Sequence, residues 1–136
     1  MKLEVLAAEF TVCKVAGYKG VDLESPFTFA GSTEAEKSLV CPTERVPGET
    51  LAREDGWRGM RIVGHLDFAL IGILARISSA LASAGIGLFA VSTFDTDYVF
   101  VKAGNLDRAL ETLAGAGFEI EGNAFRMDHR EQEERR

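Results

Sequence analysis

The stretch "LIGILARISSALASAG", residues 70–85, decides the fold because its apolar residues recur at helical spacing. Those apolar residues are Leu70, Ile73, Leu74, Ile77 and Leu81. Asp67 is the predicted N-cap of this helix, and Gly85 is its predicted stop. An apolar run at 60–63 comes before it and predicts a strand. The sequence therefore predicts a strand that leads into an amphipathic helix with one buried face.

Two strands, a second helix and a last strand follow. "IGLFAVSTF" (86–94) and "DYVFV" (97–101) are separated by a short polar turn, so they predict an antiparallel hairpin. The second helix is predicted to begin after the N-cap Asn105 and to end at Gly117. "FEIEG" (118–122) alternates like a strand. This order predicts an α+β, ferredoxin-like βαββαβ fold, with two helices on one face of a four-stranded antiparallel sheet.

The N-terminal half shows a different pattern. Short strands are expected at 9–17, 26–31 and 37–41, with proline and glycine between them. "STEAEK" (32–37) is consistent with one helical turn, and 46–56 has the composition of a linker. No long amphipathic helix is evident here. The N-terminal half is therefore expected to be a smaller unit than the C-terminal half.

Size and composition exclude several classes of function. The chain has 136 residues, of which 46% are hydrophobic and 26% charged, and its net charge is -6. This acidic balance argues against a nucleic-acid groove and against an anionic membrane surface. No apolar stretch is long enough to span a bilayer, and the N-terminus does not resemble a signal peptide. A cytoplasmic protein is expected.

The candidate catalytic and metal-binding residues form no motif. Cys13, Cys41 and His65 do not have the spacing of a nucleophile and its base, so the sequence predicts no enzyme, and both cysteines are expected to be buried. Asp95 and Asp97 could begin a metal site with oxygen ligands. However, an apolar strand follows Asp97 directly, and Asp95 suits a turn. We therefore expect no metal and no cofactor.

The start of the first predicted helix is a candidate binding element. The first N–H groups of a helix are unpaired and carry partial positive charge, so they favour a carboxylate. Gly72 has no side chain and would let a ligand approach the backbone. Alternatively, Gly72 only lets the helix pack closely against a neighbour. Chemistry alone leaves both interpretations open.

The stretch 66–120 resembles an ACT domain, a small ligand-sensing module of amino-acid metabolism. The similarity rests on Asp67 before the helix, Gly72 in its first turn, and "AGIGLFAVST" (84–93). "STFDTDYVFVK" (92–102) is most similar to the ACT repeats of aspartate kinases and of the arginine sensor CASTOR. "SLVCPTERVPG" followed by "GWRGMRIVGHLDF" resembles small bacterial proteins with a shortened N-terminal ACT-like unit and a full C-terminal one.

This resemblance implies a set of ligand-binding residues. In ACT domains the loop and helix start after the first strand contact the ligand's α-carboxylate or α-amine, which here implies Leu70, Ile71 and Gly72. The hairpin contacts the rest of the ligand, here through Thr93, Phe94 and Asp97. The helix start suits a carboxylate and Asp97 suits an ammonium or guanidinium, so together they would clamp a zwitterionic or basic amino acid.

The resemblance also implies domains and a role. It gives a shortened ACT-like unit with a linker (1–56), a full ACT domain (57–124) and a charged tail (125–136). The expected protein is a non-catalytic, allosteric amino-acid sensor that binds its ligand between ACT units, forms a homodimer and acts on an unidentified regulated protein. The alternative is a dimerisation module that binds no ligand.

Overall fold

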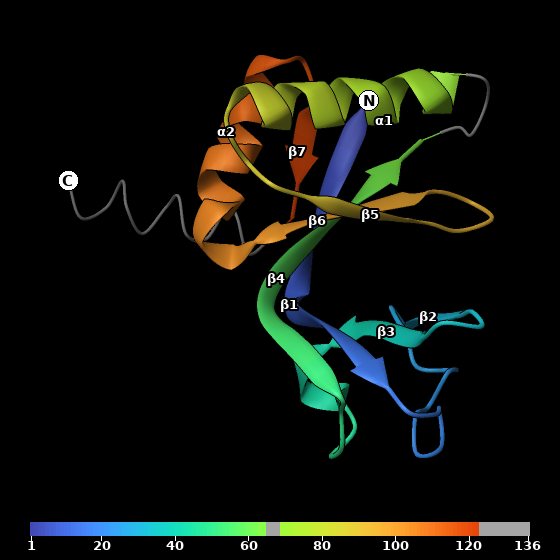
Figure 1. Ribbon diagram of the computed structural model, residues 1–136. Helices are drawn as coiled ribbons and strands as arrows, with labels where there is room; N and C mark the ends of the chain where they lie inside the picture. Colours follow the sequence, from blue (N-terminus) through green and yellow to red (C-terminus); the bar gives the residue numbers. More distant parts are fainter. Residues whose placement is uncertain (65–68, 123–136) are drawn as a thin grey trace. The chain divides into compact units, whose positions relative to one another are not determined.

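The computed structural model describes residues 1–64 and 69–122 and divides into two compact units (Figure 1). Unit 1 combines Met1–Ala7 with the chain from Arg58 onward, and unit 2 is Ala8–Trp57. Two long strands, β1 (Lys2–Val15) and β4 (Ala52–Val63), contribute residues to both units. Unit 1 is therefore built from two separate parts of the sequence.

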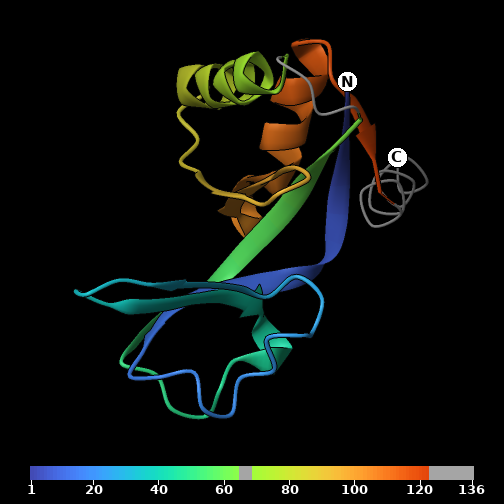
Figure 2. The ribbon, with the colours of Figure 1, turned by 90° about the vertical axis from the view of Figure 1, so that its right-hand side faces the viewer.

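Unit 1 is a small α+β fold with two helices and a mainly antiparallel sheet. The elements after β4 are α1 (Ala69–Ser83), β5 (Phe89–Ser92), β6 (Asp97–Lys102), the 3-10 turn η2 (Ala103–Asn105), α2 (Leu106–Gly115) and β7 (Glu119–Glu121). This order confirms the predicted succession of strands and helices. Figure 2 shows that both helices lie on the same side of β4.

The pairing of the last strand differs from the prediction. β5 pairs with β6, β6 with β4, and β4 with β1, while β7 pairs with β1 in parallel, Leu3 opposite Ile120. The first strand of the chain, β1, therefore lies between β4 and β7. In a four-stranded sheet made from residues 57–124 alone, no strand would separate these two. The reason is hydrophobic: Leu3 and Val5 are buried, so the start of β1 supplies core side chains to unit 1.

The core of unit 1 lies between the sheet and the two helices. α1 contributes Ile73, Ile77 and Leu81, which are buried as their helical spacing predicts. The sheet contributes Leu3, Val5, Met60, Ile62, Val99 and Val101, and α2 contributes Leu106, Ala109, Leu110 and Leu113. Each fully buried large aliphatic side chain contributes about 1.5–3 kcal/mol.

Glycines end both helices, as predicted. Gly85 follows α1 with φ 72°, and the N–H of Ile86 donates to the carbonyl of Leu81 at 2.9 Å. Gly117 follows α2 with φ 101°, in the left-handed region that glycine adopts without steric cost. Asn105 does precede α2, but its side chain makes no capping hydrogen bond. The predicted N-cap Asp67 lies outside the described residues.

Unit 2 is a sheet of short strands without an α-helix among its residues. Its elements beside β1 and β4 are β2 (Phe29–Ser32), β3 (Lys37–Pro42) and the 3-10 turn η1 (Thr43–Arg45). The expected helical turn at 32–37 is wrong: Thr33 Oγ1 accepts from the N–H groups of Ala35 and Glu36, which closes a hairpin turn instead. The expected linker at 46–56 is also too long, because β4 already begins at Ala52.

Candidate functional site

The turn between β5 and β6 is tightly hydrogen-bonded. The N–H of Thr93 donates to the carbonyl of Thr96 at 2.8 Å, and Thr93 Oγ1 donates to the same carbonyl at 3.0 Å. Phe94 and Asp95 occupy the tip of the turn and are exposed. Phe94 is 100% exposed, so its ring packs against no side chain in the described part of the chain. The turn itself agrees with the predicted hairpin.

Thr96 attaches this turn to the end of β4. Its hydroxyl donates to the carbonyl of Ile62 at 2.7 Å, and the residue is buried. The chain passes from β4 towards α1 just after this point. Figures 1 and 2 both show the hairpin turn and the start of α1 at the same end of unit 1. Sequence reasoning treated Thr96 only as a turn residue and missed this contact, for which the sequence shows no clear signal.

Asp97 is a buried carboxylate at this end of the sheet. It is only 6% exposed, and it lies directly opposite Ser92, whose hydroxyl donates to Asp97 Oδ1. Because strand residues alternate, Asp97 lies on the same face as Val99 and Val101, the face that the helices cover. Burying a carboxylate is costly unless it is paired and hydrogen-bonded. Within residues 1–64 and 69–122, Asp97 forms no salt bridge.

The start of α1 supplies the other half of the predicted site. Leu70 and Ile71 lie in the first turn of α1, but their side chains fall outside the described part of the structure. Gly72 is exposed, and a Cβ built there would meet no atom within 4 Å. Packing among the described residues of this chain therefore does not require a glycine at 72. His65 also falls outside the described residues.

A second hairpin in unit 2 matches this one in sequence and geometry. "FAGST" (29–33) and "FAVST" (89–93) begin 60 positions apart, and a strand and a 3-10 turn follow each at the same offset. The N–H of Thr33 donates to the carbonyl of Glu36 at 2.8 Å, as Thr93 does to Thr96. Sequence reasoning missed this repeat, although aligning the two pentapeptides reveals it.

The residue equivalent to Asp97 has the opposite charge. Lys37 lies opposite Ser32 in the β2–β3 ladder, and its Nζ donates to Ser32 Oγ at 2.8 Å. In unit 1 the same serine position donates to Asp97 instead. The two hairpins thus present an ammonium in one unit and a carboxylate in the other. At this position a ligand cation would meet a carboxylate in unit 1 and an ammonium in unit 2.

The two cysteines lie in the small core of unit 2. Cys13 and Cys41 pack with Val15 and Leu39. Burial raises the pKa of the Cys41 thiol to about 11, with a smaller contribution from the neighbouring Cys13. Burial also raises the pKa of Cys13. A protonated thiol is a poor nucleophile, so both side chains behave as small hydrophobic groups at neutral pH.

This raised pKa predicts a loss of stability at alkaline pH. The folded-state pKa of Cys41 lies above its ordinary value of 9.0. The protonated thiol therefore contributes its full stabilisation of the folded state below pH 9, and this contribution is lost as the pH rises through about 11. We expect the free energy of unfolding of unit 2 to fall by about 1–2 kcal/mol over this range. Urea unfolding followed by fluorescence of Trp57, the single tryptophan, measures it. Cys41→Ala should show a shallower pH dependence; equal slopes in both proteins would contradict the assignment.

Metal-binding and membrane-spanning features were also sought. In the part of the chain that the structure describes, no three histidine, cysteine or acidic residues are grouped so that they could hold a metal ion. Among the described helices, none combines the length and the apolarity needed to cross a bilayer.

Comparison with known proteins shows what this chain is similar to. Residues 52–115 match the family model of the ACT domain. A crystal structure of a protein from Agobacterium tumefaciens is similar to this chain with 29% identity and a TM-score of 0.80, covering 90% of this chain and 92% of that one. A Vibrio cholerae protein of unknown function, described as a possible transport protein, is 22% identical with a TM-score of 0.64, covering 84% of this chain and 88% of that one. No curated protein matches.

Aspartate kinases share the fold at lower identity. The regulatory subunit of aspartate kinase from Thermus thermophilus is 12% identical with a TM-score of 0.57, covering 86% of this chain and 98% of that one. Aspartate kinase from Clostridium acetobutylicum, an allosteric enzyme, is 15% identical with a TM-score of 0.58, covering 84% of this chain and 33% of that one. ACT domains are regulatory and often bind small molecules. Residues 52–115 of this chain are therefore similar to an ACT domain, and the aspartate kinases share the fold.

Proposed function

We propose that this protein is a non-catalytic regulator that binds an amino acid at the end of unit 1 where Asp97 and the start of α1 lie. The observation that carries the proposal is the buried carboxylate of Asp97, which a serine hydroxyl contacts and no described cation neutralises. An ammonium group would offset the cost of burying this charge. The regulatory role of ACT domains supports the same conclusion.

The start of α1 would receive the carboxylate of the ligand. The first N–H groups of a helix favour an anion, and Gly72, with no described atom within 4 Å of a Cβ built on it, leaves the backbone open to a ligand. Thr93 and Phe94 are exposed beside Asp97. Because Phe94 projects into solvent, it would contact the ligand only where another ACT unit encloses the site. The proposal therefore includes a ligand held between units, with Leu70 and Ile71 at the helix start.

The repeat of the two hairpins supports a tandem arrangement. We infer that unit 2 is a reduced ACT unit, because its strands and turns follow those of unit 1 at a constant offset while its helices are missing. The domain boundaries 1–56, 57–124 and 125–136 remain a prediction. The homodimer, the cytoplasmic location and a separate regulated protein belong to the same proposal.

Isothermal titration of the full chain with the twenty amino acids tests the proposed site. At least one amino acid should bind wild type, and Asp97→Asn should weaken binding by about tenfold or more, because a charge-assisted hydrogen bond is lost. Asp95→Asn is the matched control, since it removes the same charge two positions away at an exposed site. If no amino acid binds, or if both variants bind equally well, the proposal is wrong.

A dimerisation module without a ligand is the second candidate function. Its supporting observation is Phe94, a fully exposed aromatic side chain on an ordered turn, next to the edge strand β5. Exposed aromatic groups and strand edges both favour association. In this case light scattering should show a dimer that Phe94→Ser weakens, and saturating amino acids should change neither the mass nor the melting temperature.

A further inference from the structure

Unit 2 contains a pocket where it lacks the helices of unit 1. Loops replace helices on both sides: residues 16–28 connect β1 to β2, and residues 43–51 connect β3 to β4. Tyr18, Val21 and Val46 from these loops pack on the small core of the unit. The loops nevertheless leave a pocket of about 930 Å³ between residues 16–20 and 47–53. This volume lies at the upper end of the range for small-molecule sites, about 300–1,000 Å³.

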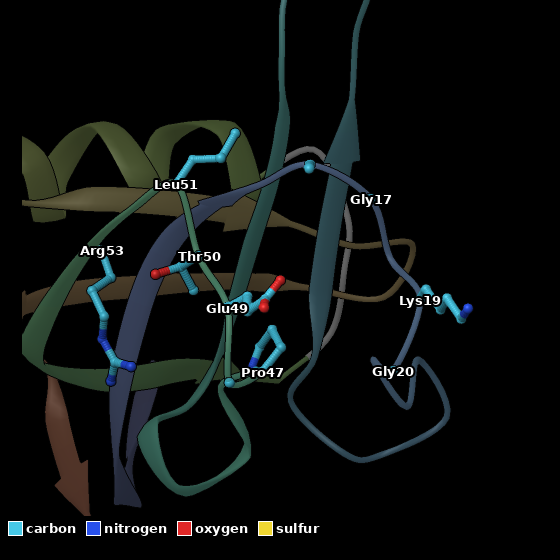
Figure 3. Close-up of a pocket in the computed structure, with 10 residues that line it drawn as sticks. Gly17, Lys19, Gly20, Pro47, Glu49, Thr50, Leu51 and Arg53 are labelled. Atoms are coloured by element: carbon cyan, nitrogen blue, oxygen red, sulfur yellow. The ribbon is translucent and has the colours of Figure 1, made fainter.

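The pocket has opposite charges on its two walls. Glu49 belongs to the wall 47–53, and Figure 3 shows Lys19 on the opposite loop with its side chain directed away from Glu49. In residues 1–64 and 69–122, neither side chain forms an ion pair. Arg53 is different, because its Nε and Nη2 donate to Asp55 Oδ1 at 3.2 and 2.8 Å. The pocket therefore offers the carboxylate of Glu49 directly, and the ammonium of Lys19 would reach a ligand after a rotation of its exposed side chain.

The rest of the lining suits a peptide-like molecule. Gly17, Gly20 and Gly48 expose their backbone, since a Cβ built on any of them meets no atom within 4 Å. Open backbone N–H and C=O groups can hydrogen-bond to amide groups of a ligand. Pro47 and the exposed Leu51 add apolar surface. Polar groups set in partly apolar walls are the usual composition of a ligand site.

We propose that this pocket binds a zwitterion of the size of a short peptide, with its cationic end at Glu49 and its carboxylate at Lys19. A free α-amino acid with an uncharged side chain carries both charges on one carbon, so it could engage only one wall. A longer zwitterion separates the charges and fills more of the volume. This site is distinct from the one at Asp97 and does not depend on the proposed function.

Calorimetric titration of the full chain with trialanine tests this site. Trialanine should bind, and acetyl-trialanine amide, which has the same backbone without end charges, should bind at least about tenfold more weakly. Glu49→Gln should weaken trialanine binding by a similar factor. Glu34→Gln, an exposed glutamate outside the pocket, should leave it unchanged. Absence of trialanine binding, or equal binding of the blocked peptide, would overturn the proposal.

A steric variant tests the location without changing charge. Gly48→Phe places a ring in the pocket, where the open surroundings of Gly48 accommodate it, and it should abolish trialanine binding. Gly104→Phe in unit 1 is the matched control, because a Cβ there also meets no atom within 4 Å. Unchanged binding by Gly48→Phe would overturn the location. Asp97→Asn should bind trialanine like wild type. The proposal for this pocket and the proposal for the site at Asp97 can therefore be disproved independently of each other.

Discussion

Truncating Phe100 to alanine is expected to destabilise unit 1 by about 3–5 kcal/mol, because it removes a large, fully buried ring from the sheet. Phe100 stacks on Phe89 with ring centroids 4.8 Å apart and planes inclined by 14°. Its ring edge also lies over the backbone of Gly59. A Cβ built at Gly59 would be 2.8 Å from Phe100 Cε1 and 3.1 Å from Cδ1. Any side chain at position 59 would therefore collide with the ring of Phe100 unless the ring moved.

This contact predicts strong coupling between the two positions. Gly59→Ala alone should cost about 1–3 kcal/mol through overpacking. In the Phe100→Ala background the same change should cost close to nothing, since the two atoms nearest the new methyl group belong to the Phe100 ring and the next, Leu6 Cδ1 at 3.4 Å, is at ordinary contact distance. Urea unfolding followed by far-UV circular dichroism gives all four free energies. Gly104→Ala should cost the same in both backgrounds, and additive effects of Gly59→Ala and Phe100→Ala would contradict the assigned contact.

The helices of unit 1 are predictable from the sequence because their signal is local. Ile73, Ile77 and Leu81 recur at helical spacing and are buried together, and Gly85 ends the helix by its own backbone preference. The partner of β7 is not a local property. It depends on Leu3 and Val5, more than a hundred positions earlier, and a three-residue strand carries too little pattern to specify its neighbour.

The candidate site shows the same division between local and non-local information. The turn between β5 and β6 follows from turn-forming residues at 95 and 96, and the exposed Asp95 differs from the buried Asp97 as expected for a turn residue. The burial of Asp97 depends on its position opposite Ser92 and next to β4, which only the folded sheet defines. The contact of Thr96 with Ile62 likewise joins positions 34 residues apart.

The repeated hairpin suggests why only one unit would carry the proposed amino-acid site. Both hairpins use the same serine and threonine positions to form the turn, so the turn chemistry serves the fold. The position after the turn differs in charge, Lys37 against Asp97. Under the proposed function, this difference would decide which of the two hairpins receives the cationic end of an amino acid. Lys37→Asp therefore gives position 37 the charge of Asp97, and the hydrogen bonds of Thr33 that close the turn do not involve Lys37.

Replacing Gly72 by alanine should stabilise the protein and weaken the proposed amino-acid binding at the same time. Glycine inside a helix costs about 0.5–1 kcal/mol relative to alanine, and the new methyl group would meet no described atom within 4 Å. The free energy of unfolding should therefore rise by this amount. If the ligand contacts the backbone at Gly72, the methyl group displaces it, and affinity should fall by about tenfold to a hundredfold.

These two effects separate the two explanations for Gly72. If Gly72 serves only to pack α1 against a neighbouring unit, Gly72→Ala should weaken the dimer, which light scattering over a dilution series measures. If Gly72 instead admits a ligand, Gly72→Ala should leave the dimer intact and reduce the affinity for the amino acid.

Ala75→Gly, at an exposed position of the same helix, is the matched control for helix propensity. It should lower stability by about the amount that Gly72→Ala raises it, and it should leave the affinity unchanged. Undiminished affinity in Gly72→Ala would remove the start of α1 from the proposed site and leave Asp97 as its remaining charged contact.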